Sequence, residues 1–347
     1  MSSHIEQIVE IPGKFGFGTM SLTWTPKPKP IEEQINILKF VSDYGIKFLN
    51  GGEFYGENDV NLKLFQKFLA GNTPEVNRQL VISIKGGFGP TGPDGSKEGV
   101  SRSIDNILSY FSTDIKNRPK LIFEMARVDV KVPYEQTLGY INEYVKSGKL
   151  DGISLSEVGI GSIQKAISVA PISCVEIELS LFTQDILNNG ILQILSENNI
   201  TVVAYSPLCR GLLTDYTVEN ADTFLDNIPD GDFKKSTGKF QPDNFKHNLH
   251  LLKLLYDFAH DVKKVSLESL AISWIVSLSQ RKNFRNFKQV SKIVPIPSGS
   301  TPEKITKNLA NIIELTDDDL KTIDDLCTQH PVKGLRYDEN HEKLLNL

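Results

Sequence analysis

A tyrosine that follows two glycines is the first residue of this sequence whose position suggests chemistry. The segment Phe48–Gly56 reads FLNGGEFYG, in which a short apolar run breaks at Asn50-Gly51-Gly52 and Tyr55 precedes a helical stretch. Glycine permits a sharp loop because it adopts backbone angles that other residues avoid. The pattern therefore places the Tyr55 phenol on a strand-to-helix loop, where α/β folds collect catalytic groups, although the segment alone also fits a surface tyrosine in a turn.

The chemistry open to such a phenol depends on a nearby positive charge. A phenol with a pKa of ~10 is a weak acid at neutral pH unless its anion is stabilised. Lys85 directly follows the apolar run at 80–84, which predicts the next strand, and an ammonium there would stabilise a tyrosinate. Taken alone, Lys85 fits a solvated charge at a strand end equally well, so the pairing with Tyr55 carries the catalytic interpretation.

Strand-like and helix-like segments alternate along the chain and would position these two residues. Short runs rich in β-branched residues predict strands at 16–20, 47–49, 80–84, 121–126, 153–158, 174–179, 201–205 and 292–296. Eight repeats without a linker favour an α/β fold, a single (β/α)8 TIM barrel, over a doubly wound sheet. We expect one domain over residues 1–347, with a C-terminal segment from about 316 to 347 packing on it.

In such a barrel, catalytic residues lie at the carboxyl ends of the strands. Seven residues fall at or just beyond predicted strand ends and should surround one opening: Tyr55, Lys85, Ala126, Ser156, Glu176, Tyr205 and Ser298. The one long irregular stretch runs from Leu208 to about Asn248, after strand seven. A loop of this length is usually functional or disordered, and its scattered phenylalanines predict a packed lid.

One glycine motif is misleading. Residues 87–92 match G-x-G-x-x-G after a strand, but a dinucleotide fingerprint must open directly into a helix. Pro90 and Pro93 crowd this turn, and no acidic residue closes a second strand about twenty residues later. We therefore do not assign a Rossmann site.

Composition and charge narrow the class of protein. The 347 residues are 39% hydrophobic, with a net charge of −5 and a pI near 5.8. This balance gives no electrostatic case for nucleic acid or an anionic membrane, and no apolar run approaches the length of a membrane span. The start, MSSHIEQIVEI, does not read as a signal peptide, so we expect a cytoplasmic protein. The sequence carries no indication of the oligomeric state.

Cysteine and histidine spacing predicts no metal site. Three scattered cysteines, Cys174, Cys209 and Cys327, form no C-x-x-C pair and fit ordinary buried thiols in a reducing compartment. None of the histidines lies at a predicted strand end, and no pair has both metal-ligand spacing and a carboxylate partner; they are His4, His247, His250, His260, His330 and His341.

Together, the barrel pattern and four segments resemble the aldo-keto reductases. The segments are Phe48–Gly56, Lys85 after strand three, VVAYSPLCRG at 202–211 and PIPSGSTPEKITKNL at 295–309. The likeness covers nearly the whole chain, in the expected order and spacing. Within that family, NGGEFYG at 50–56 and the Ala-Arg-Val-Asp at 126–129 are most similar to the fungal pyridoxal reductases (pyridoxine 4-dehydrogenases).

The resemblance implies NADPH bound across the barrel opening without a Rossmann fold, and hydride transfer to a carbonyl. Tyr55 matches the proton donor, and Lys85 would set its acidity. The family has an aspartate where this chain has Asn50, and a histidine where it has Ala126. We expect Asn50 to accept a hydrogen bond from Lys85 without neutralising it, so that Lys85 depresses the pKa of Tyr55 further. Ala126 should leave room for a bulkier aldehyde.

The resemblance also implies roles for the remaining site residues, each at a matching position of this sequence. Arg127, Glu53 and Trp24 are assigned with Ala126 to the substrate pocket, although surface ion pairing explains Arg127 and Glu53 equally well. Tyr205 matches the ring that stacks on the nicotinamide, and Ser156 and Glu176 match the positions that hold its carboxamide. Four residues match those around the pyrophosphate: Ser206, Leu208, Arg210 and Gly211.

The segment after strand eight predicts the second half of the cofactor site. Ser298, Ser300 and Thr301 precede Pro302 at the start of a helix, and the free amides of a helix N-terminus attract anions. Lys304 matches the cation that grips a 2′-phosphate, and Asn308 matches the residue that reads adenine. Hydroxyls and a cation, with no carboxylate aimed at the ribose, favour NADPH over NADH.

The sequence therefore predicts an NADPH-dependent reductase of an aldehyde, with pyridoxal to pyridoxine, in vitamin B6 metabolism, as the leading reaction. Three alternatives stay open: reduction of another aldehyde or ketone, an NADPH-binding redox sensor with little turnover, and a lyase that forms a Schiff base through Lys85.

Overall fold

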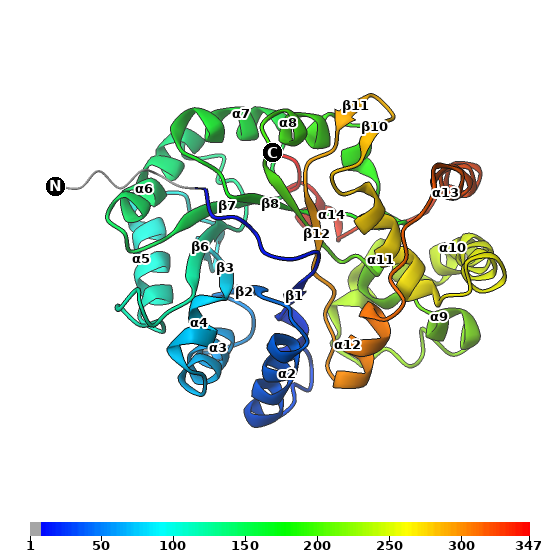
Figure 1. Ribbon diagram of the computed structural model, residues 1–347, viewed down its shortest axis with the longest axis horizontal. Helices are drawn as coiled ribbons and strands as arrows, with labels where there is room; N and C mark the ends of the chain where they lie inside the picture. Colours follow the sequence, from blue (N-terminus) through cyan, green and yellow to red (C-terminus); the bar gives the residue numbers. More distant parts are fainter. Residues whose placement is uncertain (1–7) are drawn as a thin grey trace.

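A computed structural model describes residues 8–347 of the chain. Eight strands, each parallel to its neighbours, form the central sheet in the order β1-β2-β3-β6-β7-β8-β9-β12. Their bounds are β1 Gly16–Gly18, β2 Phe48–Gly52, β3 Val81–Gly86, β6 Lys120–Met125, β7 Gly152–Ser156, β8 Cys174–Glu178, β9 Thr201–Tyr205 and β12 Ile293–Pro295. The sheet curls into a nearly closed barrel ringed by helices (Figure 1), which confirms the predicted (β/α)8 fold.

Two glycines bring the first strand close to the last. A Cβ atom at Gly16 would lie 2.8 Å from Cγ2 of Ile296, and one at Gly18 would lie 3.3 Å from the Ile296 carbonyl oxygen. Larger residues at either position would push β1 away from the end of β12. The two edges of the sheet therefore meet here by close backbone packing.

Helices connect the strands and cover their outer faces. The main ones are α2 Ile31–Asp43, α3 Val60–Ala70, α5 Lys97–Leu108, α6 Tyr134–Lys146, α7 Ile160–Val169, α8 Ile191–Glu197, α11 Leu267–Leu278 and α12 Pro302–Leu309, with short α1 Met20–Thr23 and α4 Pro74–Arg78. In α6, the buried residues Tyr134, Leu138 and Ile141 recur at the helical spacing that forms one apolar stripe. Such stripes pack on the strands to form one large core.

The barrel interior changes from apolar to charged along the strands. Side chains alternate between the two faces of a strand, so every second residue points inward. At the amino-terminal end the inward residues form a second apolar cluster, closed by Val9 and Ile11: Phe48, Val81, Ile122, Cys174, Val203, Val294 and Ile296. One or two inward positions further along lie Asn50, Lys85, Glu124 and Glu176. The fold thus buries ionisable groups beneath the opening at the carboxyl ends of the strands.

The segment after β9 is ordered and helical rather than one long loop. It contains short helices η2 Cys209–Gly211, α9 Asp215–Glu219, η3 Phe233–Ser236 and η4 Gly238–Phe240, and then α10 Pro242–Asp257 and η5 Phe258–Lys263. The irregular stretch predicted to reach about Asn248 therefore ends earlier, because α10 begins at Pro242. Proline suits the first turn of a helix. The Phe224 ring stacks on Phe245 at 5.4 Å and on Phe240 at 6.4 Å, so the predicted packing of this segment is confirmed.

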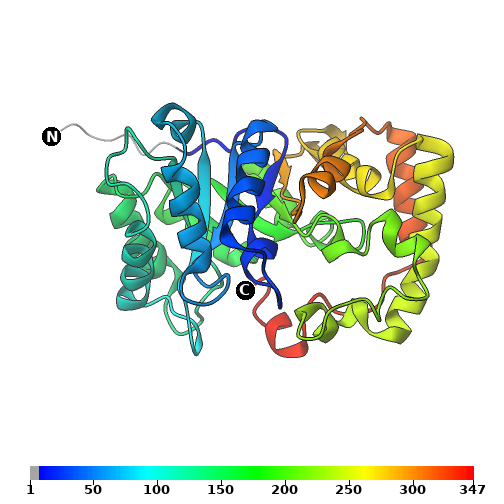
Figure 2. The ribbon, with the colours of Figure 1, turned by 90° about the horizontal axis from the view of Figure 1, so that it is seen from below.

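Several elements were absent from the sequence prediction. The G-x-G-x-x-G segment forms a hairpin, β4 Phe88–Gly89 with β5 Gly92–Pro93, and opens no helix. A second hairpin, β10 Lys282–Phe284 with β11 Phe287–Gln289, precedes β12. Helix α13 Asp317–Gln329 packs beside α10 as an outer layer (Figure 2), and α14 Glu339–Glu342 follows. Among residues 8–347, no helix is both long and apolar enough to cross a membrane.

Candidate active site

Tyr55 lies at the barrel opening, in the loop that follows β2. Thr23 at the end of α1 donates a hydrogen bond from Oγ1 to the Tyr55 carbonyl at 2.8 Å. The next residue, Gly56, has a φ of +96°, and a Cβ atom there would lie 2.8 Å from the Thr23 carbonyl oxygen. Only glycine fits this turn without strain. The loop is thus fixed, and its phenol is 6% exposed.

An aromatic wall covers Tyr55. The Trp24 ring lies 5.8 Å from the Tyr55 ring, and Phe54 meets Tyr55 edge-on at 5.4 Å. Trp24 itself remains half exposed. The structure therefore brings Trp24, which was assigned to the substrate pocket, directly beside the candidate proton donor.

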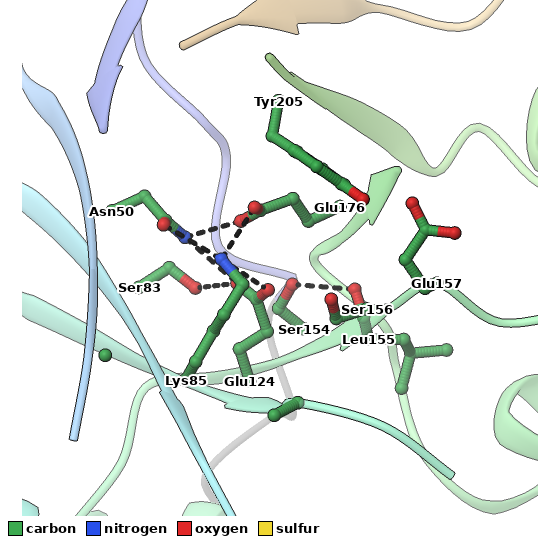
Figure 3. Close-up of polar contacts among 12 residues, drawn as sticks. Asn50, Ser83, Lys85, Glu124, Ser154, Leu155, Ser156, Glu157, Glu176 and Tyr205 are labelled. Atoms are coloured by element: carbon green, nitrogen blue, oxygen red, sulfur yellow. Dashed lines mark hydrogen bonds and ion pairs between the residues drawn. The ribbon is translucent and has the colours of Figure 1, made fainter. Parts of the chain in front are cut away.

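Lys85 contacts acceptors from three other strands (Figure 3). Its Nζ donates to Asn50 Oδ1 at 3.0 Å and to Glu176 Oε1 at 2.6 Å, and lies 3.2 Å from Glu124 Oε1. The expected hydrogen bond from Lys85 to Asn50 is confirmed. Ser83 Oγ donates to Glu124 Oε2 at 2.9 Å. We call these five residues the Lys85 network.

Tyr55 joins this network through its ring. Lys85 Nζ lies 5.6 Å from the ring centroid. Burial is the main reason that the pKa of Tyr55 is raised to about 12. Lys85 lowers this pKa, whereas Glu176 and Glu124 raise it. The direction of the Lys85 effect on this pKa is therefore as expected, but burial outweighs it and the net shift is upward. The two glutamates supply the negative charge that Asn50 lacks.

Burial and neighbouring charges together shift the pKa values of Lys85 and Glu176. Burial opposes the Lys85 ammonium, but Glu124 and Glu176 outweigh it and hold the pKa of Lys85 well above its usual value. Burial and then Glu124 raise the pKa of Glu176 to about 8, against the opposing effect of Lys85. Two carboxylates around one ammonium therefore retain a proton near neutral pH. A lysine held protonated in this way is poorly suited to Schiff-base formation, which needs the neutral amine.

Glu176 was assigned to the nicotinamide carboxamide. In the structure one of its oxygens accepts from Lys85, and the other accepts from Asn50 Nδ2 at 2.6 Å. Its carboxylate therefore belongs to the Lys85 network.

Ala126 and Arg127 lie just past the end of β6. Ala126 is buried, and the Arg127 guanidinium donates to its carbonyl at 2.6 Å and to Ser156 Oγ at 3.2 Å. Burial opposes the charge of Arg127, but the nearby tyrosines and Glu157 raise its pKa. Within the described part of the chain, Arg127 makes no ion pair with a carboxylate. It is a largely buried cation with unused donors.

The C-terminal segment reaches the opening and contacts Tyr205. The hydroxyls of Tyr205 and Tyr337 lie 3.0 Å apart. Next to them, Arg336 forms two hydrogen bonds of 3.0 Å with the fully buried carboxylate of Glu157. Figure 2 shows this red segment on the same end of the barrel as the yellow-green segment after β9. No local sequence pattern predicted these contacts.

Four predicted pyrophosphate contacts form a tight loop after β9. Ser206, Arg210 and Gly211 all have positive φ, and Leu208 is buried. Arg210 pairs with Glu178 at 3.6 Å, donates to the Arg336 carbonyl and lies over the Tyr337 ring at 4.5 Å. Arg210 therefore ties this loop to the C-terminal segment.

The segment after β12 has features that fit a phosphate group. Thr301 Oγ1 accepts from the Lys304 amide at 3.2 Å and caps α12. Ser298 Oγ lies 2.5 Å from Ser21 Oγ, and its carbonyl accepts from Asn308 at 3.1 Å. Among residues 8–347 the exposed Lys304 ammonium forms no ion pair. Ser300 precedes the same helix. This donor set suits an anion at the helix N-terminus.

One acidic residue lies in the same turn. The Glu303 side chain is held by its own backbone amide and by Thr301, and these bonds lower its pKa. We expected no carboxylate aimed at the ribose, and the Glu303 carboxylate is held locally within this turn.

Glu53 forms its hydrogen bonds with helix α5 and not with the other predicted pocket residues. Its carboxylate accepts hydrogen bonds from Ser103 at 2.5 Å, Asn106 at 2.9 Å and Arg102 at 3.2 Å, all on α5. It anchors the Tyr55 loop to that helix. Glu124 was missed, although its position two residues before Ala126 on one strand places both side chains on the inner face. No local signal pointed to Arg336 or Tyr337.

Metal-binding geometry is absent from the described residues: no group of three His, Cys, Asp or Glu side chains gathers there. His4, one of the histidines considered above, lies outside the described residues.

Comparison with known proteins identifies the family. The Aldo/keto reductase family model matches residues 14–327. The chain is 33% identical over 341 residues to "Probable pyridoxal reductase 2" of Schizosaccharomyces pombe, covering 96% of this chain and 97% of the relative. It is 35% identical over 345 residues to "Putative pyridoxal reductase" of Saccharomyces cerevisiae, covering 93% and 95%.

Solved structures share the fold at lower sequence identity. A glycerol dehydrogenase from Gluconobacter oxydans superposes with a TM-score of 0.76 at 20% identity, covering 95% of this chain and 97% of that one. An aldo-keto reductase from Klebsiella pneumoniae, in complex with NADPH, gives a TM-score of 0.63 at 14% identity, covering 96% and 94%. The chain belongs to the aldo/keto reductase family, which uses NADPH, and is an NADP-dependent reductase.

Proposed function

We propose that this protein reduces an aldehyde to an alcohol with NADPH, and that pyridoxal is its substrate. One observation carries the proposal: the buried Tyr55 phenol lies beside the Lys85 ammonium, 5.6 Å from ring centroid to Nζ, at the barrel opening. This is the arrangement of a general acid with a cation that stabilises its conjugate base.

Reduction of a carbonyl needs a hydride at carbon and a proton at oxygen. When bound, NADPH supplies the hydride. Tyr55 donates its hydroxyl proton to the developing alkoxide, and Lys85 stabilises the tyrosinate that forms. Because the pKa of Tyr55 is about 12, the phenol is fully protonated at neutral pH, and its proton is available when the alkoxide develops.

Three features support an aromatic aldehyde such as pyridoxal. Trp24 and Phe54 provide flat apolar surface beside Tyr55. Ala126 contributes only a methyl group at the end of β6. Arg127 offers unused donors, and pyridoxal carries an acidic ring hydroxyl next to its aldehyde, which a guanidinium can bind. The names of the two fungal relatives point to the same substrate.

The cofactor would be held along the opening. Tyr205 offers a ring for the nicotinamide and Ser156 a hydroxyl for its carboxamide. The loop from Ser206 to Gly211 would hold the pyrophosphate. The N-terminus of α12, with Lys304, would take the 2′-phosphate, and Asn308 would contact adenine.

A second function is favoured by one observation. A proton donor whose pKa is about 12 is a weak acid, so an NADPH-binding redox sensor with little turnover also fits the site. Reduction of a different aldehyde or ketone is a variant of the main proposal.

The deciding experiment follows NADPH oxidation with pyridoxal, benzaldehyde and a small ketone. We expect the highest kcat/KM for pyridoxal. Equal values for all three would contradict the substrate assignment, and quenching of tryptophan fluorescence by NADPH without turnover of any of them would favour the sensor.

A further inference from the structure

Lys85 has a partner of opposite charge on a strand three places away in the sheet. Its shortest contact is Glu176 Oε1 on β8, at 2.6 Å, whereas Glu124 Oε1 on β6 is 3.2 Å away. All three side chains are at least nine-tenths buried. A buried ammonium requires a carboxylate at close range, because desolvation is otherwise uncompensated. Glu176 fills that role most directly.

Asn50 supports this pair with every polar atom of its amide. An asparagine side chain has one carbonyl oxygen and two N–H donors. Its oxygen accepts from Lys85 at 3.0 Å, and its nitrogen donates to Glu176 Oε2 at 2.6 Å and to Glu124 Oε2 at 3.1 Å. Asn50 thus links the ammonium to both carboxylates.

An aspartate at position 50 would not fit this arrangement. It would remove both donors that the glutamates use and would place a third carboxylate around one ammonium. Conversely, a glutamine at position 176 would remove the carboxyl group closest to Lys85, which carries a negative charge above about pH 8. The residue types at positions 50 and 176 are therefore matched to each other.

We propose that Glu176 is the positioning residue for Lys85, and that Asn50 and Glu176 act as a matched pair in which β8 supplies the carboxylate and β2 the neutral amide. The inference rests on the proposed function in naming Tyr55 as the group that Lys85 serves. Glu176 contacts Lys85 and not the reacting atoms, so it acts through Lys85.

The pairing makes a specific prediction for exchanging the two residue types. Above about pH 8, where Glu176 is ionised, Glu176→Gln should lower kcat/KM for pyridoxal by at least about 10-fold, because Lys85 loses its closest carboxylate. Asn50→Asp should also lower it, because three carboxylates then surround one ammonium. The double variant Asn50→Asp/Glu176→Gln should recover about 10-fold or more over Glu176→Gln, since the carboxylate returns on β2.

The pH profile separates positioning from a general loss of structure. Glu176 raises the pKa of Tyr55, so a neutral glutamine should move the alkaline limb of the kcat/KM profile to lower pH. The double variant should move it back toward the wild-type position. A defect of folding alone would lower activity without moving this limb.

A urea-unfolding cycle on the same four proteins tests the pairing without activity. We expect the two changes to be less destabilising together than the sum of their separate effects. This result would hold even if the protein reduced none of the aldehydes, so failure of the proposed function is distinguishable. Additive losses in both stability and kcat/KM, or a Glu176→Gln variant identical to wild type in activity and pH profile, would overturn the inference.

Discussion

Lys85 Nζ and Glu176 Oε1 meet at 2.6 Å inside the barrel, although 91 residues separate them in the chain. The contact joins β3 to β8 across the interior and gives the lysine a second carboxylate besides Glu124 on the neighbouring β6, while β2 offers only the amide of Asn50. Tyr55, the proposed acid–base group, therefore lies beside a buried cluster whose charge depends on long-range packing.

The buried glutamates should make stability depend on pH. The pKa of Glu176 is raised from 4.5 to about 8, so the folded chain retains a proton that the unfolded chain releases between these values. Stability from this group is fully present below pH 4.5 and is lost as pH rises toward 8, with a slope of at most about 1.4 kcal/mol per pH unit.

Glu124→Gln should reduce that dependence, because a neutral side chain no longer repels the Glu176 carboxylate. Urea unfolding at about pH 4.5 and about pH 8, the two limits of the window, would measure the difference. We expect the wild type to lose stability relative to the variant as pH rises. Parallel curves would contradict the effect of Glu124 on the pKa of Glu176.

Arg336→Ala should destabilise the protein strongly. It removes the guanidinium that forms two hydrogen bonds with Glu157, whose carboxylate is fully buried. Loss of one member of a buried ion pair costs about 3–5 kcal/mol. Lys321→Ala, which breaks an exposed pair with Asp325, is the matched control and should leave the urea midpoint close to wild type. Equal midpoints for both variants would show that the Arg336 contact is dispensable.

Arg127→Met should affect pyridoxal more than benzaldehyde. The change keeps an unbranched side chain but removes the guanidinium, and a hydrogen bond to a charged group contributes about 1.5–3 kcal/mol. We expect KM for pyridoxal to rise at least about 10-fold while KM for benzaldehyde, which lacks the ring hydroxyl, changes little. An equal rise for both substrates would argue against contact with the hydroxyl.

Lys304→Ala should weaken NADPH binding selectively. Lys304 is exposed and, within residues 8–347, has no carboxylate partner to release. We expect the Kd for NADPH to rise about 10-fold, as measured by quenching of tryptophan fluorescence, with little change for NADH, which lacks the 2′-phosphate. A similar loss for both cofactors would place the phosphate elsewhere.

Much of the barrel follows from local pattern. Apolar runs such as 80–84 and 201–205 and the glycines around Tyr55 predict strands and a tight loop, because burial and backbone freedom act over a few residues. Once the strands are ordered, parallel neighbours bring Asn50 and Lys85 together, so that hydrogen bond was predictable.

Contacts between distant segments were not predictable in the same way. Glu157 and Arg336 are 179 residues apart, and nothing near either residue specifies the other. The hairpin at 282–289 and the early start of α10 depend on packing against other elements. Glu124 could have been found, because strand alternation puts it on the inner face with Ala126. The pKa of Tyr55 lies above its usual value mainly because the phenol is buried, and Glu176 and Glu124 add to that effect.

Tyr55→Phe tests the central claim most directly, because it removes one hydroxyl and keeps the ring that packs on Trp24. NADPH binding, measured by fluorescence quenching, should stay close to wild type, while kcat for the aldehyde that the wild type reduces best should fall at least about 100-fold, the lower end for loss of a general acid. Turnover near the wild-type rate in this variant would contradict the role of Tyr55 as the proton donor.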